Sequence, residues 1–104
     1  MTTTMIAGHP VDVNDEGFLI NPTQWDETLG AELGRLIGID MTEDHWTLIR
    51  FLRADYLATG ETPTIRRVST RTGVPVKRLF ELFPKKPAKK MAYVAGLPKP
   101  KGCV

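Results

Sequence analysis

Glycine and proline interrupt this chain at short intervals, and they restrict it to short helices and strands. Between the interruptions, apolar residues recur at the spacing of one helical face, as Trp25, Leu29 and Leu33 do. The segments that this pattern predicts to be helical are residues 22–37, 42–59, 65–71, 76–83 and 88–95. We expect the second of them to be the central and most buried helix, because further apolar side chains widen its apolar face.

A short β-hairpin is predicted ahead of the helices. Val11 and Val13 alternate with polar residues, a turn signal follows at residues 14–17, and Phe18 and Ile20 resume the alternation. A hairpin is marginal by itself, so we expect it to lie on the helices. The predicted fold is therefore mostly α, of the α+β class: an N-terminal β-hairpin packed on a small helical bundle with a helix-turn-helix-like pair and a flexible C-terminal arm.

Size and composition place a single domain in this chain. With 104 residues, 41% of them hydrophobic, one modest core can form. We expect a globular domain over residues 1–96, with residues 1–7 disordered, and an arm over residues 97–104. One cysteine cannot form an internal disulfide, and with two separated histidines it makes too few soft ligands for a structural zinc site. We expect no metal and no cofactor.

The N-terminus and the hydropathy of the chain favour a cytoplasmic protein that does not enter a membrane. No stretch approaches the roughly 18 apolar residues of a membrane span. The first residues lack the basic start and the apolar run of a signal peptide. A monomer is expected.

Charge is divided unevenly along the chain. Residues 1–61 hold three basic and eleven acidic residues, whereas residues 62–104 hold eleven basic residues and a single acidic one, Glu81. A basic half of this kind can dock an anionic partner, and it can equally be a solvated surface.

The first candidate functional segment is a helix-turn-helix pattern over residues 64–83. Base edges are contacted from the first turns of a recognition helix, where Lys77 and Arg78 stand. Arg67 and Arg71 on the preceding helix complete the set of residues that this alternative would use to bind nucleic acid. The same geometry also recurs as plain packing in small helical proteins.

The second candidate is Cys103, one residue from the end of the sequence. After Gly102 and two prolines there is no neighbouring chain to bury this thiol. A thiolate is the species that attacks sulfur, and a free cysteine titrates near 8.5, so only a few per cent is ionised at neutral pH. Lys99 and Lys101 favour the anion.

The predicted arm supplies reach. From Gly96 to Cys103 an extended tail could project the sulfur about 20 Å beyond the body. Two prolines stiffen this segment and reduce the entropy lost when it enters a partner's site. These are the properties of a swinging carrier.

The C-terminal decapeptide, residues 95–104, is a specific motif that reads Ala-Gly-Leu-Pro-Lys-Pro-Lys-Gly-Cys-Val. Further short motifs precede it along nearly the whole chain, at residues 15–19, 24–25, 43–46, 50–53, Tyr56 and 63–66. Together, and in this order, they resemble the motifs of the DsrC/TusE family.

The resemblance implies a sulfur relay protein that carries sulfane sulfur as a persulfide on Cys103. It also implies partner proteins, an upstream sulfur-donor complex and a downstream acceptor of the thiouridylase or sulfite reductase type, in tRNA thiolation or sulfur metabolism. We expect the partners to contact Lys89, Lys99, Lys101, Gly102 and Arg66. Such a chain is a sulfurtransferase-type carrier; the alternatives are a helix-turn-helix regulator and a non-catalytic subunit of a sulfur-metabolising complex.

Two further expectations concern single positions. Ala92 stands where DsrC proper carries a second cysteine, so this chain resembles the single-cysteine TusE members. The large aromatic residues are expected in the core, and His45 is expected to be a partly buried residue at a helix start; the aromatic residues are Trp25, Trp46, Phe51, Phe80 and Phe83.

Overall fold

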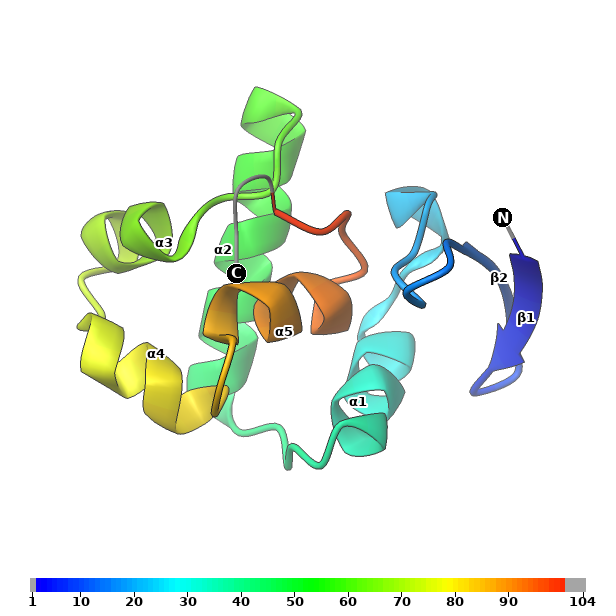
Figure 1. Ribbon diagram of the computed structural model, residues 1–104, viewed down its shortest axis with the longest axis horizontal. Coiled ribbons are helices and arrows are strands. Elements are labelled where there is room, and N and C mark those ends of the chain that lie inside the picture. The colour runs from blue at the N-terminus through cyan, green and yellow to red at the C-terminus, as the bar shows by residue number, and fades with distance from the viewer. Residues whose placement is uncertain (1, 101–104) are drawn as a thin grey trace.

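The computed structural model describes residues 2–100 and shows a β-hairpin followed by a helical bundle (Figure 1). The hairpin consists of β1 (Thr2–Ile6) and β2 (His9–Val13), and a short 3-10 helix, η1 (Pro22–Gln24), comes next. The α-helices are α1 (Glu27–Leu36), α2 (Glu43–Thr59), α3 (Ile65–Thr72), α4 (Val76–Leu82) and α5 (Pro87–Val94). The prediction of a mostly helical α+β fold with an N-terminal hairpin is confirmed.

The hairpin lies further toward the N-terminus than the sequence suggested. Thr2–Ile6 pairs with His9–Val13 in antiparallel register, and Ala7 and Gly8 form the turn with positive φ. The prediction that residues 1–7 are disordered is therefore wrong for β1, whose β-branched threonines suit a strand although most of them are exposed. The turn predicted at residues 14–17 does form, with Asn14 Oδ1 accepting from two amides. Beyond the turn, the described residues form an isolated bridge between Val13 and Leu19 in place of the predicted second strand.

The first predicted helix is divided into two. Asn21 caps η1, as its amide oxygen accepts from the Thr23 amide, and the chain is then extended at Trp25 and Asp26. Asp26 caps α1, because its carboxylate accepts from the Leu29 amide at 2.8 Å. The other four helices begin and end within about one residue of the predicted positions.

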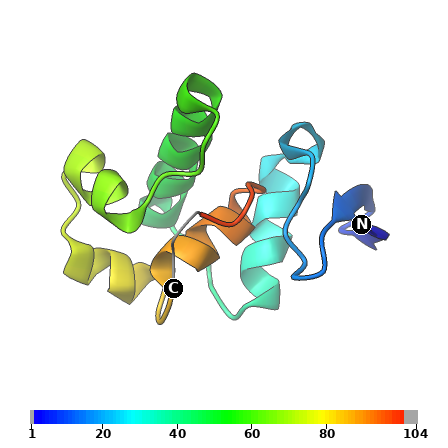
Figure 2. The ribbon, with the colours of Figure 1, turned by 45° about the horizontal axis from the view of Figure 1, so that its top comes forward.

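Two clusters of buried side chains hold the fold together. The larger joins α2, α3, α4 and α5, and the smaller joins the hairpin to α1. Trp25 and Tyr93 pack against both clusters. The central helix is α5, which contacts α1, α2 and α4 (Figures 1 and 2) and buries most of its residues, so the prediction that α2 is the most buried helix is wrong.

The aromatic predictions hold in part. Phe83 is fully buried, and Trp25, Trp46 and Phe51 pack partly buried against the larger cluster. Phe80 is 47% exposed: α4 faces the core through Leu79, and the next residue of a helix points about 100° away from it.

His45 is a structural residue at the start of α2. It is buried, its Nδ1 accepts from the Thr42 amide, and its Nε2 therefore carries the proton and donates to Leu82 O at 2.9 Å. These bonds tie the start of α2 to the end of α4.

Candidate functional site

The root of the C-terminal segment is packed into the body. Gly96 ends α5 in the left-handed conformation, with φ +69, and its amide donates to Tyr93 O, while the Leu97 amide donates to Ala92 O. This pair of bonds is the Schellman motif, which buries an apolar residue after the glycine. Leu97 is that residue, and it is 1% exposed.

The prediction of a flexible arm from residue 97 onward is therefore corrected for residues 97–100. Leu97 belongs to the larger core cluster, the Pro98 carbonyl is hydrogen-bonded, and Pro100 is buried. The physical reason is the apolar side chain at 97, whose burial stabilises the turn that follows α5. Lys101, Gly102 and Cys103 lie outside the described residues.

Trp25 and Arg53 hold the end of α5. The Trp25 indole N–H donates to Val94 O at 2.8 Å, and Arg53 Nη1 donates to Ala95 O at 2.7 Å. The guanidinium carbon of Arg53 also lies 4.2 Å from the centre of the Trp25 ring, a cation–π contact. Burial lowers the pKa of Arg53 from its ordinary value.

Close packing at Gly96 completes this contact. A Cβ built on Gly96 would lie 2.7 Å from Cγ and 2.9 Å from Cβ of Trp25. Only a residue without a side chain lets the indole approach the backbone this closely. The end of α5 is thus fixed against the segment that precedes α1.

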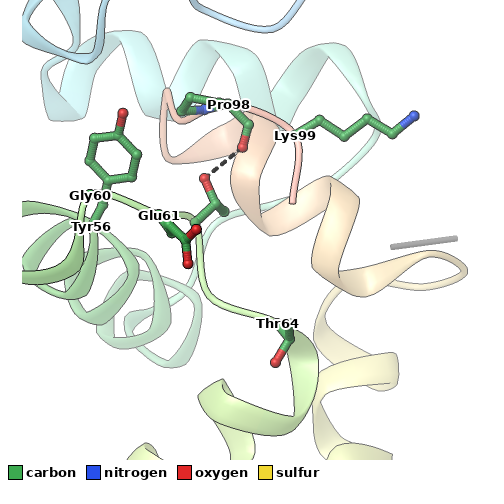
Figure 3. A pocket seen from close by; sticks show the side chains of 7 residues that line it. Tyr56, Gly60, Glu61, Thr64, Pro98 and Lys99 are labelled. Carbon is green, nitrogen blue, oxygen red and sulfur yellow. Dashed lines mark hydrogen bonds between the residues drawn. The ribbon is translucent and has the colours of Figure 1, made fainter. Parts of the chain in front are cut away.

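A shallow pocket lies beside the next residues of the C-terminal segment. The Thr62 hydroxyl donates to Pro98 O at 2.7 Å across one wall of this pocket (Figure 3). Its volume is about 270 Å³, and it is lined by Tyr56, Gly60, Glu61, Thr62, Thr64, Pro98 and Lys99.

Two of the predicted partner-binding lysines meet at one carboxylate. Lys99 Nζ lies 3.3 Å and Lys89 Nζ 3.5 Å from Glu16 Oε2. The hydrogen bond and charge of Lys99, followed by Lys89, lower the pKa of Glu16. All three groups remain accessible, so salt weakens their attraction and a partner carboxylate can compete for the lysines.

Arg66 lies apart from those lysines. It is exposed in the first turn of α3, two residues after Thr64 of the pocket. Its side chain makes no hydrogen bond or ion pair with another residue of the described range 2–100.

The helix-turn-helix pair is present as α3 and α4, but half of its predicted nucleic-acid-binding residues have partners within the chain. Arg67 binds the buried Asp55 carboxylate through Nε and Nη2, the latter at 2.8 Å, and these bonds hold the pKa of Asp55 below its ordinary value. Arg78 pairs with Asp44 at 2.9 Å and with Glu81. Lys77 and Arg71 are exposed. The nucleic-acid alternative is not favoured.

Other classes of site lack support in the described part of the chain. Within residues 2–100 there is no group of three metal-ligating side chains. None of the helices described is both long and apolar enough to cross a bilayer.

The sequence interpretation missed four residues of this region: Glu16, Trp25 as a hydrogen-bond donor, Arg53 and Thr62. Arg53 left a signal, since it shares the apolar face of α2 with Ile49 and Leu52, and an arginine on a buried face requires acceptors. For Thr62 no local signal exists, because its partner Pro98 is 36 residues away.

Comparisons with known proteins agree with this geometry. A family model described as DsrC-like protein matches residues 5–104. The sulfurtransferase TusE of Yersinia pseudotuberculosis is 38% identical over 104 residues, covering 93% of this chain and 96% of that protein.

Solved structures give the same result. The DsrC of Allochromatium vinosum, determined by NMR, superposes with a TM-score of 0.86 at 34% identity, covering 98% of this chain and 97% of that one. The DsrC, or gamma subunit of dissimilatory sulfite reductase, of Pyrobaculum aerophilum gives a TM-score of 0.82 at 39% identity, covering 99% and 95%. The family model, the sequence relative and the solved structures each match this chain over almost its full length. This chain therefore belongs to the DsrC-like family.

Proposed function

We propose that this protein is a sulfur relay protein that carries sulfane sulfur as a persulfide on Cys103 and passes it to a partner protein. The observation that carries the proposal is the family match, which extends through residue 104 and so includes the only cysteine of the chain. A full-length relative is named a sulfurtransferase.

The chemistry requires no cofactor. The Cys103 thiolate attacks the outer sulfur of a donor persulfide, a Cys103 Sγ–S bond forms, and the donor's S–S bond breaks to release the donor as a thiolate. Hand-over repeats the exchange with the acceptor's thiolate as nucleophile, and Cys103 leaves as the thiolate. Sulfane sulfur moves as a neutral atom in each step, so no external oxidant or reductant is consumed.

A single cysteine suits a relay of this kind. By its resemblance to the family, Ala92 stands at the position where DsrC proper carries a second cysteine. Ala92 is fully buried in α5. With one cysteine the chain cannot close an intramolecular disulfide, so we propose hand-over between proteins and not internal redox cycling.

The proposed partners are an upstream sulfur-donor complex and a downstream acceptor, met by a monomer in the cytoplasm. Lys99, Lys89 and Arg66 are the described residues proposed to contact them, together with Lys101 and Gly102. The accessible lysines and the arginine favour a partner surface that carries carboxylates.

Intact-mass spectrometry tests the proposal. Incubation with a small persulfide such as glutathione persulfide, followed by removal of the excess, should add the mass of one sulfur atom, and a reductant should remove it. The Cys103→Ser variant should gain nothing. A wild-type protein that stays at its original mass, or a serine variant that gains the same mass, would rule out Cys103 as the carrier.

A further inference from the structure

A groove lies on the body where the end of α1 meets α5, two helices that run side by side (Figure 2). Its volume is about 370 Å³. Three apolar side chains line it: Phe18 follows β2, Ile37 follows α1 and Tyr93 belongs to α5. The other lining residues are charged, and they are Glu16, Lys86, Lys89 and Lys90. We call this site the lysine groove.

The apolar wall of the lysine groove suits a large apolar side chain. Phe18 is 2% exposed and meets the Tyr93 ring edge to face, with 5.8 Å between the ring centres. Ile37 and Tyr93 are only partly buried, so they leave apolar surface open to the groove. The Tyr93 hydroxyl makes no hydrogen bond with another residue of the described range, and burial raises the pKa of Tyr93. It is therefore a neutral donor available to a ligand.

Glu16 marks a place in the groove where a carboxylate binds. Lys89 Nζ lies 3.5 Å and Lys99 Nζ 3.3 Å from Glu16 Oε2, so two ammonium groups from separate segments converge on one oxygen. Glu16 is exposed, and solvent screens its ion pairs. A carboxylate from another protein can therefore take its place.

Two further ammonium groups are available in the lysine groove. Lys86 is exposed, and its side chain makes no hydrogen bond or ion pair within the described residues 2–100. Lys90 donates to Pro84 O at 2.5 Å, which leaves two of its three donors for a ligand. The groove thus combines an apolar wall with cationic groups, and its complement is a ligand that combines one apolar side chain with carboxylates.

We propose that the lysine groove docks an acidic segment of a partner protein. One large apolar side chain of that segment lies between Ile37 and Tyr93, and the carboxylates on either side of it bind Lys86, Lys89 and Lys90. The inference rests on the proposed function for the role of the partner, which would donate or accept sulfur. Docking at the groove does not itself require sulfur chemistry.

A nucleic acid fits this groove less well than an acidic polypeptide. It would bring a phosphate with every nucleotide past the Glu16 carboxylate, which repels it. None of the lining residues in the described part of the chain is an arginine, the residue that pairs with phosphate through two parallel hydrogen bonds.

NMR titration of the full-length, nitrogen-15-labelled protein with a synthetic peptide tests the inference. The probe is Glu-Asp-Gly-Trp-Gly-Asp-Glu, acetylated and amidated at its ends. We expect the amide signals of Gly17, Gly38, Lys90 and Tyr93 to shift, and those of β1, at the far end of the molecule (Figure 1), to stay in place. The dissociation constant should be on the order of 1 mM, because one buried side chain and screened charges supply the affinity.

Two altered peptides separate the apolar and the charged contributions. Alanine in place of the tryptophan should weaken binding about tenfold or more, since the apolar anchor is lost. Glutamine and asparagine in place of the four acids should abolish the salt dependence of binding as well as weaken it.

Variants of exposed residues test the groove from the other side. Lys86→Gln should weaken binding of the acidic peptide about two- to fivefold, as expected for one screened ion pair, whereas Lys77→Gln on α4 should leave it unchanged. Glu16→Gln removes the internal competitor and should strengthen binding about two- to fivefold. Asp15→Asn makes the same change of charge at the neighbouring exposed residue, outside the lining, and should have a much smaller effect.

Several results would overturn the inference. They are an absence of shifts at about 5 mM peptide, shifts centred on β1 or α4, equal affinity for the alanine peptide, and weaker binding by Glu16→Gln. A short single-stranded RNA that shifts the groove signals at lower concentration than the peptide would assign the groove to nucleic acid and overturn it too.

The sulfur-loading experiment remains independent of these outcomes. Glutathione persulfide carries no docking segment, so Lys86→Gln should gain sulfur as the wild type does. A protein that binds the peptide in the groove but never gains sulfur would refute the proposed function alone. A protein that gains sulfur but does not bind the peptide would refute the docking inference alone.

Discussion

Replacing Gly96 with alanine tests the contact on which the end of α5 depends. The new methyl group would lie 2.7 Å from Cγ and 2.9 Å from Cβ of Trp25, well inside normal carbon contact. These atoms are next to the Trp25 backbone, so they cannot swing away as the tip of a flexible side chain could. The backbone of Gly96 is also left-handed, with φ +69.

Two terms add to the destabilisation. An alanine in the left-handed region costs about 1–2 kcal/mol, and overpacking of a well-packed site adds about 1–3 kcal/mol. Gly73→Ala is the matched control, because Gly73 has φ +78 at the end of α3 but nothing within 4 Å of its Cβ position. The control should show only the backbone term.

Urea denaturation followed by circular dichroism measures both variants on one scale. The free energy of unfolding should fall further for Gly96→Ala than for Gly73→Ala, by about 1–3 kcal/mol. Equal losses in the two variants would mean that the Trp25 ring does not pack against residue 96, and the account of how the C-terminal segment is anchored would fail at its first contact.

The remaining stability predictions concern the arm root and the buried ion pair. Leu97→Ala should lower the free energy of unfolding by about 2–4 kcal/mol, because this side chain is buried. Leu57→Ala, at an 83% exposed site, should change it by less than about 0.5 kcal/mol. Equal small effects of the two substitutions in urea titrations would mean that Leu97 is not packed against the body. Arg67→Met should cost about 2–3 kcal/mol at pH 7, since it removes the charged hydrogen bonds to Asp55. The pKa of Asp55 is lowered in the folded protein, so the pair stabilises the fold above the ordinary pKa of about 3.9. The difference between wild type and Arg67→Met should therefore shrink as the pH falls below about 4, and a difference that does not change with pH would contradict the role of this pair.

The helices were accessible from the sequence because their signals are local. Thr42 before α2, Gly73 after α3 and Pro87 in the first turn of α5 act within a few residues of themselves, and the helices start and stop there. Asp26 shows the limit of such signals: Asn21 and Pro22 begin a helix that lasts one turn, and a second cap five residues later begins the long one.

Features that depend on distant partners were not accessible. β1 forms because its threonine-rich segment pairs with β2 in antiparallel register. No periodic apolar pattern in the sequence of β1 predicts a strand. The local sequence predicts an unpacked arm at Leu97, because the prolines after it favour extended backbone. The core residues that bury its side chain belong to other helices, so no local pattern indicates that burial. The family motifs point to the C-terminal segment as the proposed sulfur-carrying part, although they do not say where it is held.

The most direct test of the central claim measures whether Cys103 acquires sulfur in living cells. Cells expressing the tagged full-length protein would be treated to stop protein synthesis and then given cysteine labelled with radioactive sulfur. The purified wild type should carry label that a reductant releases, and Cys103→Ser, purified in parallel, should carry none. Label that is absent from the wild type, or that appears equally on the serine variant, would show that this thiol does not carry sulfur.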